Sequence, residues 1–206
     1  MSPDEVAAFE RCIARGGVAL FPADTVYGLA ADPELASAVE RLYALKGRPA
    51  DRPAAVMFFS LSAALWVLPE LGAGTRAALG RVLPGAVTVL VPNPARRFPL
   101  ACGPQPEVLG LRVPELGGAL APLAAVARPV LQSSANPSGG ADASRLADVD
   151  TAVRAGADLV LDGGELPGTP STVVDLTRYE DTGDFEVVRE GALPRGDLDA
   201  RLRPPR

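Results

Sequence analysis

Short apolar runs and longer amphipathic stretches alternate along this chain. The first pair shows the pattern: apolar residues at helical spacing from Val6 to Ile13 are followed, after Gly16-Gly17, by the continuous apolar run Val18–Phe21. A short apolar run bounded by Gly and Pro is typical of a buried strand. Strands and helices in alternation indicate an α/β fold. We therefore expect one open, twisted, mixed sheet flanked by helices.

The other expected elements continue this alternation. Ser2 and Glu5 form a capping box with Pro3 at the first helical position, so the first helix is expected to run to about Arg15. Further helices are predicted at 34–45, 61–68, 75–83, 116–127 and 145–155, and strands at 54–59, 86–91, 108–113, 130–132, 159–161, 172–176 and 185–188. The segment 92–106, rich in Pro, Arg and Gly, is expected to be a surface excursion. We expect one domain over residues 1–195 and a tail over 196–206, loose from Arg201 on.

Composition narrows the possible chemistry. The chain has no histidine, which removes the commonest general base and metal ligand and every Ser-His or Cys-His pair. Cys12 and Cys102 are too far apart to indicate a paired motif. The net charge of −5 argues against broad adhesion to nucleic acid and favours a small anionic ligand. The acidic start and the lack of a long apolar run predict a cytoplasmic protein with no membrane association.

Lys46 is the only lysine in the sequence, and it begins the motif Lys46-Gly47-Arg48-Pro49 at the end of a predicted helix. An ammonium is a compact point charge that can sit between phosphate oxygens, whereas guanidinium is a flat fork. Because every other basic residue of the chain is an arginine, this single lysine suggests a functional role. A lysine left by chance on a solvated helix end, in an arginine-rich composition, explains the same observation.

Four polar clusters follow predicted strands or helices, at residues 24–28, 46–49, 133–139 and 171–172. In open α/β sheets ligands bind at the carboxyl ends of strands, where hydroxyls, amides and cations can cradle phosphate or carboxylate oxygens. Ser, Asn and Gly also form ordinary turns, which is the competing interpretation of each cluster. Neither a Walker motif nor GxGxxG is present. Together the clusters predict an anion or nucleotide pocket of another type.

Longer motifs in the same regions resemble the threonylcarbamoyl-AMP synthase (YrdC-like) family. The matching segments are Phe21–Leu29 (FPADTVYGL), Lys46–Pro49 (KGRP), Leu83–Thr88 (LPGAVT), Arg112–Pro114 (RVP), Ser134–Gly139 (SANPSG), Ser171–Asp175 (STVVD) and Val188–Gly191 (VREG). They occur in order from about residue 10 to 193, so the resemblance covers nearly the whole chain. It implies a YrdC-like fold with a concave basic pocket, in the short single-domain form.

The activity implied by this resemblance is the joining of L-threonine, bicarbonate and ATP into threonylcarbamoyl-AMP and pyrophosphate, with Mg²⁺ accompanying the triphosphate. Such a nucleotidyltransferase supplies a tRNA-threonylcarbamoyl transferase complex that modifies position 37 of tRNA, and its own contact with tRNA is expected to be weak. Since threonine's amine can capture bicarbonate or carbon dioxide and the resulting carbamate can attack the α-phosphorus, no histidine or enzyme nucleophile is required.

The resemblance also implies roles for individual residues. The catalytic group comprises Lys46, Arg48, Ser134 and Asn136. Threonine would be held by Thr25, Arg112, Ser134 and Ser171. The nucleotide would be bound by Lys46, Arg48, Arg52, Asn136, Ser144 and Arg189. No protein metal site is expected.

The chain departs from the family pattern at Ala23, at Ala54-Ala55 and at Met57, where many members have a histidine near threonine. These departures leave open a paralogue that adenylates a different carbamate or carbamoyl substrate. A non-catalytic RNA-binding module is the third possibility, against which the acidic net charge argues.

Overall fold

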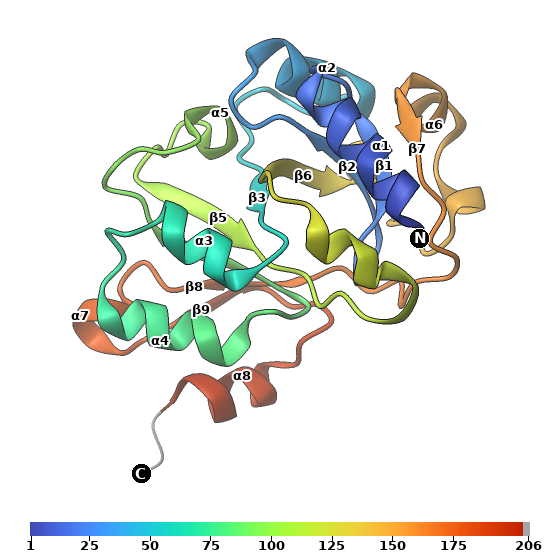
Figure 1. Ribbon diagram of the computed structural model, residues 1–206. Helices are drawn as coiled ribbons and strands as arrows, with labels where there is room; N and C mark the ends of the chain where they lie inside the picture. Colours follow the sequence, from blue (N-terminus) through green and yellow to red (C-terminus); the bar gives the residue numbers. More distant parts are fainter. Residues whose placement is uncertain (204–206) are drawn as a thin grey trace.

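The computed structural model describes residues 1–203, and within them one nine-stranded mixed sheet forms the centre of the molecule (Figure 1). The spatial order is β7-β1-β2-β6-β3-β5-β4-β8-β9, with parallel pairing for β1/β7, β3/β5 and β4/β8 and antiparallel pairing elsewhere. The strands are β1 (Ala19–Pro22), β2 (Tyr27–Ala31), β3 (Ala55–Met57), β4 (Val87–Pro92), β5 (Val108–Arg112), β6 (Val130–Ser134), β7 (Leu159–Val160), β8 (Thr172–Asp175) and β9 (Glu186–Arg189). The expected α/β class and mixed sheet are confirmed.

Helices flank the sheet. They are α1 (Pro3–Ala14), α2 (Ala36–Lys46), α3 (Leu61–Val67), α4 (Ala73–Val82), α5 (Pro99–Cys102), α6 (Thr151–Gly156), α7 (Tyr179–Thr182), α8 (Arg195–Leu202) and the 3₁₀ helices η1 (Gly118–Ala125) and η2 (Leu146–Asp148). The capping box of α1 is confirmed, because Ser2 Oγ accepts from Glu5 N at 3.2 Å and Glu5 Oε2 accepts from Ser2 N at 2.6 Å. None of the helices within residues 1–203 is long and apolar enough to cross a bilayer.

Three local expectations were wrong. Tyr27 and Gly28, expected in a polar loop, begin strand β2, because a tight turn at Ala23–Val26 folds the chain back along β1. The helix expected at 116–127 is 3₁₀, with Pro122 inside it; proline lacks the N–H that an α-helical ladder needs. The helix expected at 145–155 is divided in two, since Asp150 Oδ1 accepts from Ala152 N at 2.8 Å and caps a new helix.

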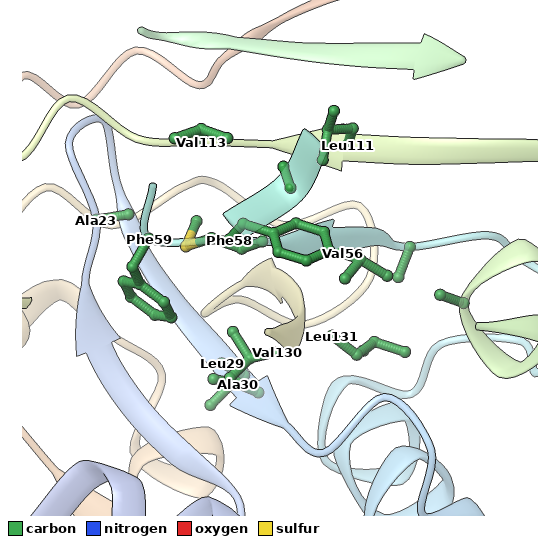
Figure 2. Packing of buried hydrophobic residues seen from close by; sticks show 14 of the residues in the cluster. Ala23, Leu29, Ala30, Val56, Phe58, Phe59, Leu111, Val113, Val130 and Leu131 are labelled. Atoms are coloured by element: carbon green, nitrogen blue, oxygen red, sulfur yellow. The ribbon is translucent and has the colours of Figure 1, made fainter. Parts of the chain in front are cut away.

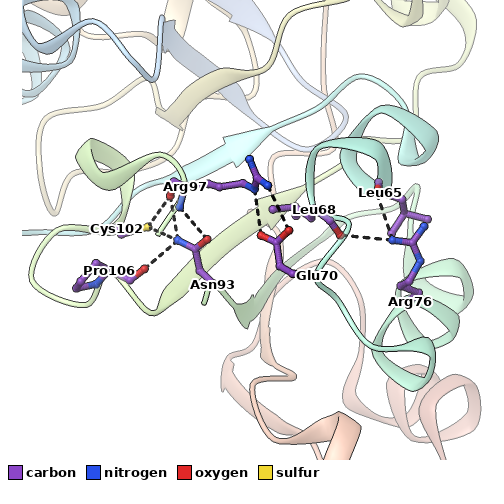
Figure 3. Close-up of polar contacts among 8 residues, drawn as sticks. All are labelled: Leu65, Leu68, Glu70, Arg76, Asn93, Arg97, Cys102 and Pro106. Carbon is purple, nitrogen blue, oxygen red and sulfur yellow. Dashed lines mark hydrogen bonds and ion pairs between the residues drawn. The ribbon is translucent and has the colours of Figure 1, made fainter. Parts of the chain in front are cut away.

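The expected surface excursion at 92–106 is held by a buried side chain (Figure 3). Asn93 is fully buried; its Nδ2 donates to Arg97 O and Pro106 O, each at 2.9 Å, and its Oδ1 accepts from Arg97 N at 3.0 Å. Arg97 in turn pairs with Glu70, at 3.0 Å from Nε to Oε1. The side-chain amide of Asn93 therefore fixes both ends of the segment. The loop-like composition of the segment did not indicate that a buried side chain would hold it.

The expected tail also needs correction. Residues 195–202 form α8, which packs against α4 with Leu198 and Leu202 fully buried, and Tyr179 Oη donates to Leu202 O at 2.6 Å. The sequence shows little sign of this helix, because its only large apolar residues are two leucines in a charged segment. Residues 204–206 of the predicted tail lie outside the described part of the chain.

The two faces of the sheet differ along its centre. In β4, Val87, Val89 and Val91 are buried, whereas the alternate residues Thr88 and Leu90 are only half-buried. Figure 2 shows part of the packed core, in which Val56 of β3, Leu111 of β5 and two residues of β6 gather with Phe58, the residue that follows β3; the β6 residues are Val130 and Leu131. Successive residues of a strand point to opposite faces of the sheet, so Thr88 and Leu90 lie on the face opposite the buried valines. That face lines a cavity.

Candidate active site

A cavity of about 350 Å³ lies over the half-buried face at the centre of the sheet. This volume falls in the range of small-molecule sites. Strands β3, β4, β5, β6, β8 and β9 all contribute to it, and so do the loops after Lys46 and around residues 142 and 170. Its charged lining residues among those described are Arg48, Arg112, Arg189 and Asp142.

Strand register explains the shape of the cavity floor. Gly110 of β5 lies between Ala55 of β3 and Leu90 of β4, and the next row pairs Arg112 with Thr88. Glycine and alanine leave the centre of this surface without long side chains. Arg112 and Thr88 then bring polar atoms to one side of the hollow. The floor is thus set by sheet pairing among segments that are distant in sequence.

Lys46 lies at the side of the cavity where β6 ends. It is the last residue of α2, which Gly47 terminates in a left-handed conformation with φ of 58°. The side chain is 3% exposed, and its Nζ donates to Ser134 O, to Asn136 O at 2.6 Å and to Asn136 Oδ1 at 2.9 Å. Ser134 Oγ also donates to Asn136 Oδ1, at 2.6 Å. The predicted group of Lys46, Ser134 and Asn136 is therefore a contiguous cluster in the structure.

The acceptors around Lys46 are all neutral. No carboxylate among residues 1–203 lies within 4 Å of its ammonium. Burial, and to a smaller extent the charge of Arg48, lower the pKa of Lys46 to about 8, while the charge of Asp142 acts in the opposite direction. A buried ammonium without a counterion favours the approach of an anion.

Arg48 belongs to the same loop and lines the cavity. Its guanidinium lies 5.6 Å from the centre of the Tyr43 ring, and its Nη2 donates to Pro53 O at 2.5 Å. Its buried Nε has no hydrogen-bond partner among the described residues. Arg48 therefore has donor capacity left for a ligand.

Arg112 lies at the other side of the cavity, completely buried, and its terminal nitrogens are occupied. Nη1 donates to Gly85 O at 3.2 Å and Val87 O at 3.0 Å, and Nη2 donates to Asp24 Oδ1 and to Thr25 Oγ1 at 3.1 Å. Since guanidinium has five N–H groups, only Nε–H has no partner here. The Asp24 carboxylate is itself buried and accepts from Glu115 N at 3.0 Å. Burial raises the pKa of Asp24, and the charge of Arg112 opposes that rise.

Ser171 connects this side to the last strand. Its Oγ lies 2.9 Å from Thr88 Oγ1, and its carbonyl accepts from Arg189 Nη2 at 2.7 Å. The loop that leads to Ser171 is fixed to β2, because Tyr27 Oη bonds with Asp162 Oδ1 and Gly163 N, at 2.9 and 3.0 Å. Burial raises the pKa of Tyr27 to about 12, so the phenol keeps its proton. Tyr27 has a packing and anchoring role.

The structure does not bring every predicted residue to the cavity. Arg52 is exposed, and neither Arg52 nor Ser144 is part of the cavity lining. Lys46 and Asn136 lie directly behind Ser134 rather than in the lining. Met57 is fully buried and is also absent from the lining, so it does not take the place of a threonine contact.

Sequence reasoning missed several lining residues. Asp142, Gln105 and Gln132 bring polar groups into the cavity, and Cys102 brings a thiol whose pKa is raised by burial. Gln132 has a recognisable signal, because it interrupts an apolar strand two positions before Ser134 on the same face. Asp142 has no such signal in a Gly-rich loop.

Comparisons with known proteins agree with this geometry. The family model Sua5/YciO/YrdC, described as telomere recombination, matches residues 11–191. A protein of Chromohalobacter salexigens named threonylcarbamoyl-AMP synthase is 34% identical over 179 residues, which are 86% of this chain and 95% of that protein. One of the same name from Pyrococcus abyssi is 29% identical over 188 residues, 91% of this chain. The chain spans 54% of that longer relative.

Solved structures give the same result. The structure of P. abyssi Sua5 complexed with L-threonine has a TM-score of 0.84 and 26% identity, and the match covers 97% of this chain and 58% of that one. Escherichia coli YciO has a TM-score of 0.78 at 25% identity, covering 96% of this chain and 94% of its own. From the extent of the family match and the agreement in fold, the chain belongs to the Sua5/YciO/YrdC family.

Proposed function

We propose that this protein is an L-threonylcarbamoyladenylate synthase, a nucleotidyltransferase that forms threonylcarbamoyl-AMP and pyrophosphate from L-threonine, bicarbonate and ATP. The names of its relatives support this activity. The carrying observation is that one cavity has a cationic side, lined by Arg48 with Lys46 directly behind Ser134, and a side suited to an amino acid at Thr25, Arg112 and Ser171.

The reaction fits a chain without histidine. Threonine's free amine attacks carbon dioxide derived from bicarbonate, which gives a carbamate and releases a proton. A carbamate oxygen then attacks the α-phosphorus of ATP, and the bond to the bridging oxygen of pyrophosphate breaks. Holding the two reactants in line and stabilising the phosphate charge supplies the catalysis, so no covalent enzyme intermediate is needed.

At the cationic side, Lys46 and Arg48 would hold phosphate oxygens and the carbamate. The ammonium of Lys46 has three acceptors for its three hydrogens, so a phosphate would take the place of one of them or act through charge alone. Asn136 keeps the ammonium in position, because its Nδ2 donates to Gly140 O at 2.5 Å and its Oδ1 faces Lys46. Ser134 would contact the reacting groups from the end of β6.

At the other side, threonine would be bound by Thr25, Ser134, Ser171 and Arg112. Because the terminal nitrogens of Arg112 are occupied, its contribution to the carboxylate would be Nε–H, with hydroxyls of Thr25 and Ser171 completing the contact. Thr88, which bonds Ser171, would orient that hydroxyl.

The remaining nucleotide contacts are assigned to Arg189 at the cavity rim and, outside the lining, to Arg52 and Ser144. Mg²⁺ would accompany the triphosphate and neutralise part of its charge. The product would pass to a tRNA-threonylcarbamoyl transferase complex, with weak direct contact to tRNA. A reaction that uses ATP and serves tRNA modification belongs in the cytoplasm.

The test is pyrophosphate release by purified protein with ATP, bicarbonate and Mg²⁺, with and without L-threonine. We expect release that depends on threonine. Lys46→Ala should lower kcat/KM by about 100-fold or more, since it removes a charge that is aimed at the phosphates. Arg81→Ala, which changes an exposed arginine of α4, is the matched control and should leave the rate unchanged.

The same assay separates the competing functions. Pyrophosphate release that is equally fast with other amino acids, or that requires no amino acid, would point to a paralogue with another carbamate or carbamoyl substrate. No release under any condition, combined with salt-dependent RNA binding, would identify a binding module and overturn the proposal.

A further inference from the structure

Asp142 is the only carboxylate in the cavity lining within residues 1–203. It is half-buried, and its side chain forms no hydrogen bond and no ion pair within 4 Å among the described residues. It shares the cavity with Arg48, and its charge acts on the ammonium of Lys46. A carboxylate that is free of protein partners thus faces the place where phosphates are expected.

The backbone on both sides of Asp142 is fixed. Gly140 N donates to Pro137 O at 2.8 Å, and Gly140 O accepts from Asn136 Nδ2 at 2.5 Å. On the other side, Ala143 is buried and its carbonyl accepts from Tyr27 N at 2.9 Å. Earlier in the loop, Ser138 N donates to Lys46 O at 2.7 Å. The same loop therefore joins Asp142 to the Lys46 cluster, so the carboxylate stays close to the phosphate side.

An unpaired carboxylate beside a triphosphate is repulsive. At a given distance, two like charges repel about four times more strongly at the effective dielectric of a protein surface than in water. Arg48 could relieve this by pairing with Asp142, yet its Nη2 bonds Pro53 O instead. A divalent cation between the carboxylate and the phosphates would convert the repulsion into attraction.

We propose that Asp142 is a protein ligand of the divalent cation that accompanies the nucleotide triphosphate, a proposal that rests on the function proposed above. Mg²⁺ is commonly bound by one or two carboxylates together with substrate phosphates, and it keeps several waters. The donors fit that pattern: Asp142 supplies one carboxylate, and the described residues contain no group of three or more His, Cys, Asp or Glu that would form an all-protein cage. The cation would take its other ligands from phosphate and water.

The test measures ATP binding by calorimetry, without threonine or bicarbonate, in EDTA and in Mg²⁺. For the native protein we expect Mg²⁺ to strengthen binding. Asp142→Asn should reduce that strengthening by about tenfold or more, and it should bind ATP in EDTA more tightly than the native protein, because the repulsion is gone. Asp181→Asn, at an exposed carboxylate on α7, is the matched control and should behave as the native protein does.

A second measurement reads the metal directly. Mn²⁺ bound with ATP to the native protein should give an electron paramagnetic resonance spectrum that changes in Asp142→Asn and not in Asp181→Asn. Equal effects of Mg²⁺ on ATP binding in the native protein and in Asp142→Asn would overturn the role of Asp142 while leaving the synthase function intact. Absence of ATP binding to the native protein in both EDTA and Mg²⁺ would overturn the function and this proposal together.

Discussion

Two buried cations differ in what surrounds them: Lys46 lies behind Ser134, which lines the cavity, and Arg112 lines the cavity itself. Lys46 donates only to neutral oxygens, those of Ser134 and Asn136, whereas Arg112 donates to the carboxylate of Asp24 as well as to neutral oxygens. The first has no carboxylate within 4 Å among the described residues, and burial lowers its pKa to about 8. The second is part of a neutral pair. The lesson is that a buried cation already paired with a protein carboxylate has only a remaining N–H to offer a ligand anion, whereas an unpaired cation also offers its charge.

The largest expected effect comes from breaking the Arg112 pair. Asp24→Asn leaves a guanidinium that is 2% exposed without its counterion, so the free energy of unfolding should fall by about 3–5 kcal/mol. Urea unfolding measures this. Glu107→Gln, which breaks the exposed pair between Arg96 and Glu107, is the control and should cost less than about 1 kcal/mol. Similar losses of unfolding free energy in the two variants would contradict a stabilising role for the buried pair of Asp24 and Arg112.

A smaller effect should appear in the pH dependence of ATP binding. Lys46 carries its charge below its pKa of about 8 and loses it above, so metal-free ATP affinity should be constant below pH 8 and fall above it. The affinity should fall by at most about tenfold per pH unit, since ATP binding above the pKa of Lys46 must take up one proton. Titration calorimetry without threonine, from pH 6.5 to 9.5, measures this.

Lys46→Arg is the matched variant for that profile, because guanidinium stays protonated throughout this range. Its ATP affinity should not fall above pH 8. A profile in the native protein that is flat up to pH 9.5 would contradict an uncompensated ammonium at this position.

The smallest expected effect concerns the floor between the two cations. A Cβ on Gly110 would lie 3.4 Å from Ala55 Cα and 3.7 Å from Ala55 Cβ, which is ordinary contact, so Gly110→Ala fits the sheet. Stability should rise by about 0.5–1 kcal/mol, because alanine loses less conformational freedom than glycine. The methyl group occupies the cavity, so calorimetric binding of ATP should weaken. Unchanged binding would place the ligand away from this floor.

Much of the fold could be predicted because each segment carries its own periodicity. Apolar runs of strand length marked β1, β4, β5 and β8, and the capping box fixed the start of α1. The predictions failed where a single residue or a tertiary contact outweighed the local sequence pattern. Pro122 made a 3₁₀ helix of an expected α-helix, and the burial of Asn93 turned a loop-like composition into an ordered segment.

The sequence by itself determined the α/β class and the family motifs, and it predicted a functional group of Lys46, Ser134 and Asn136, because these depend on residue type and local order. Only the tertiary structure decided how they are joined. Lys46 meets Asn136 across 90 positions, and Arg112 meets Asp24 across 88. It also placed Asp142 in the cavity and Met57 in the core. Periodicity reports which face of a segment is buried, whereas partners and net charge in a site follow from strand pairing between distant segments.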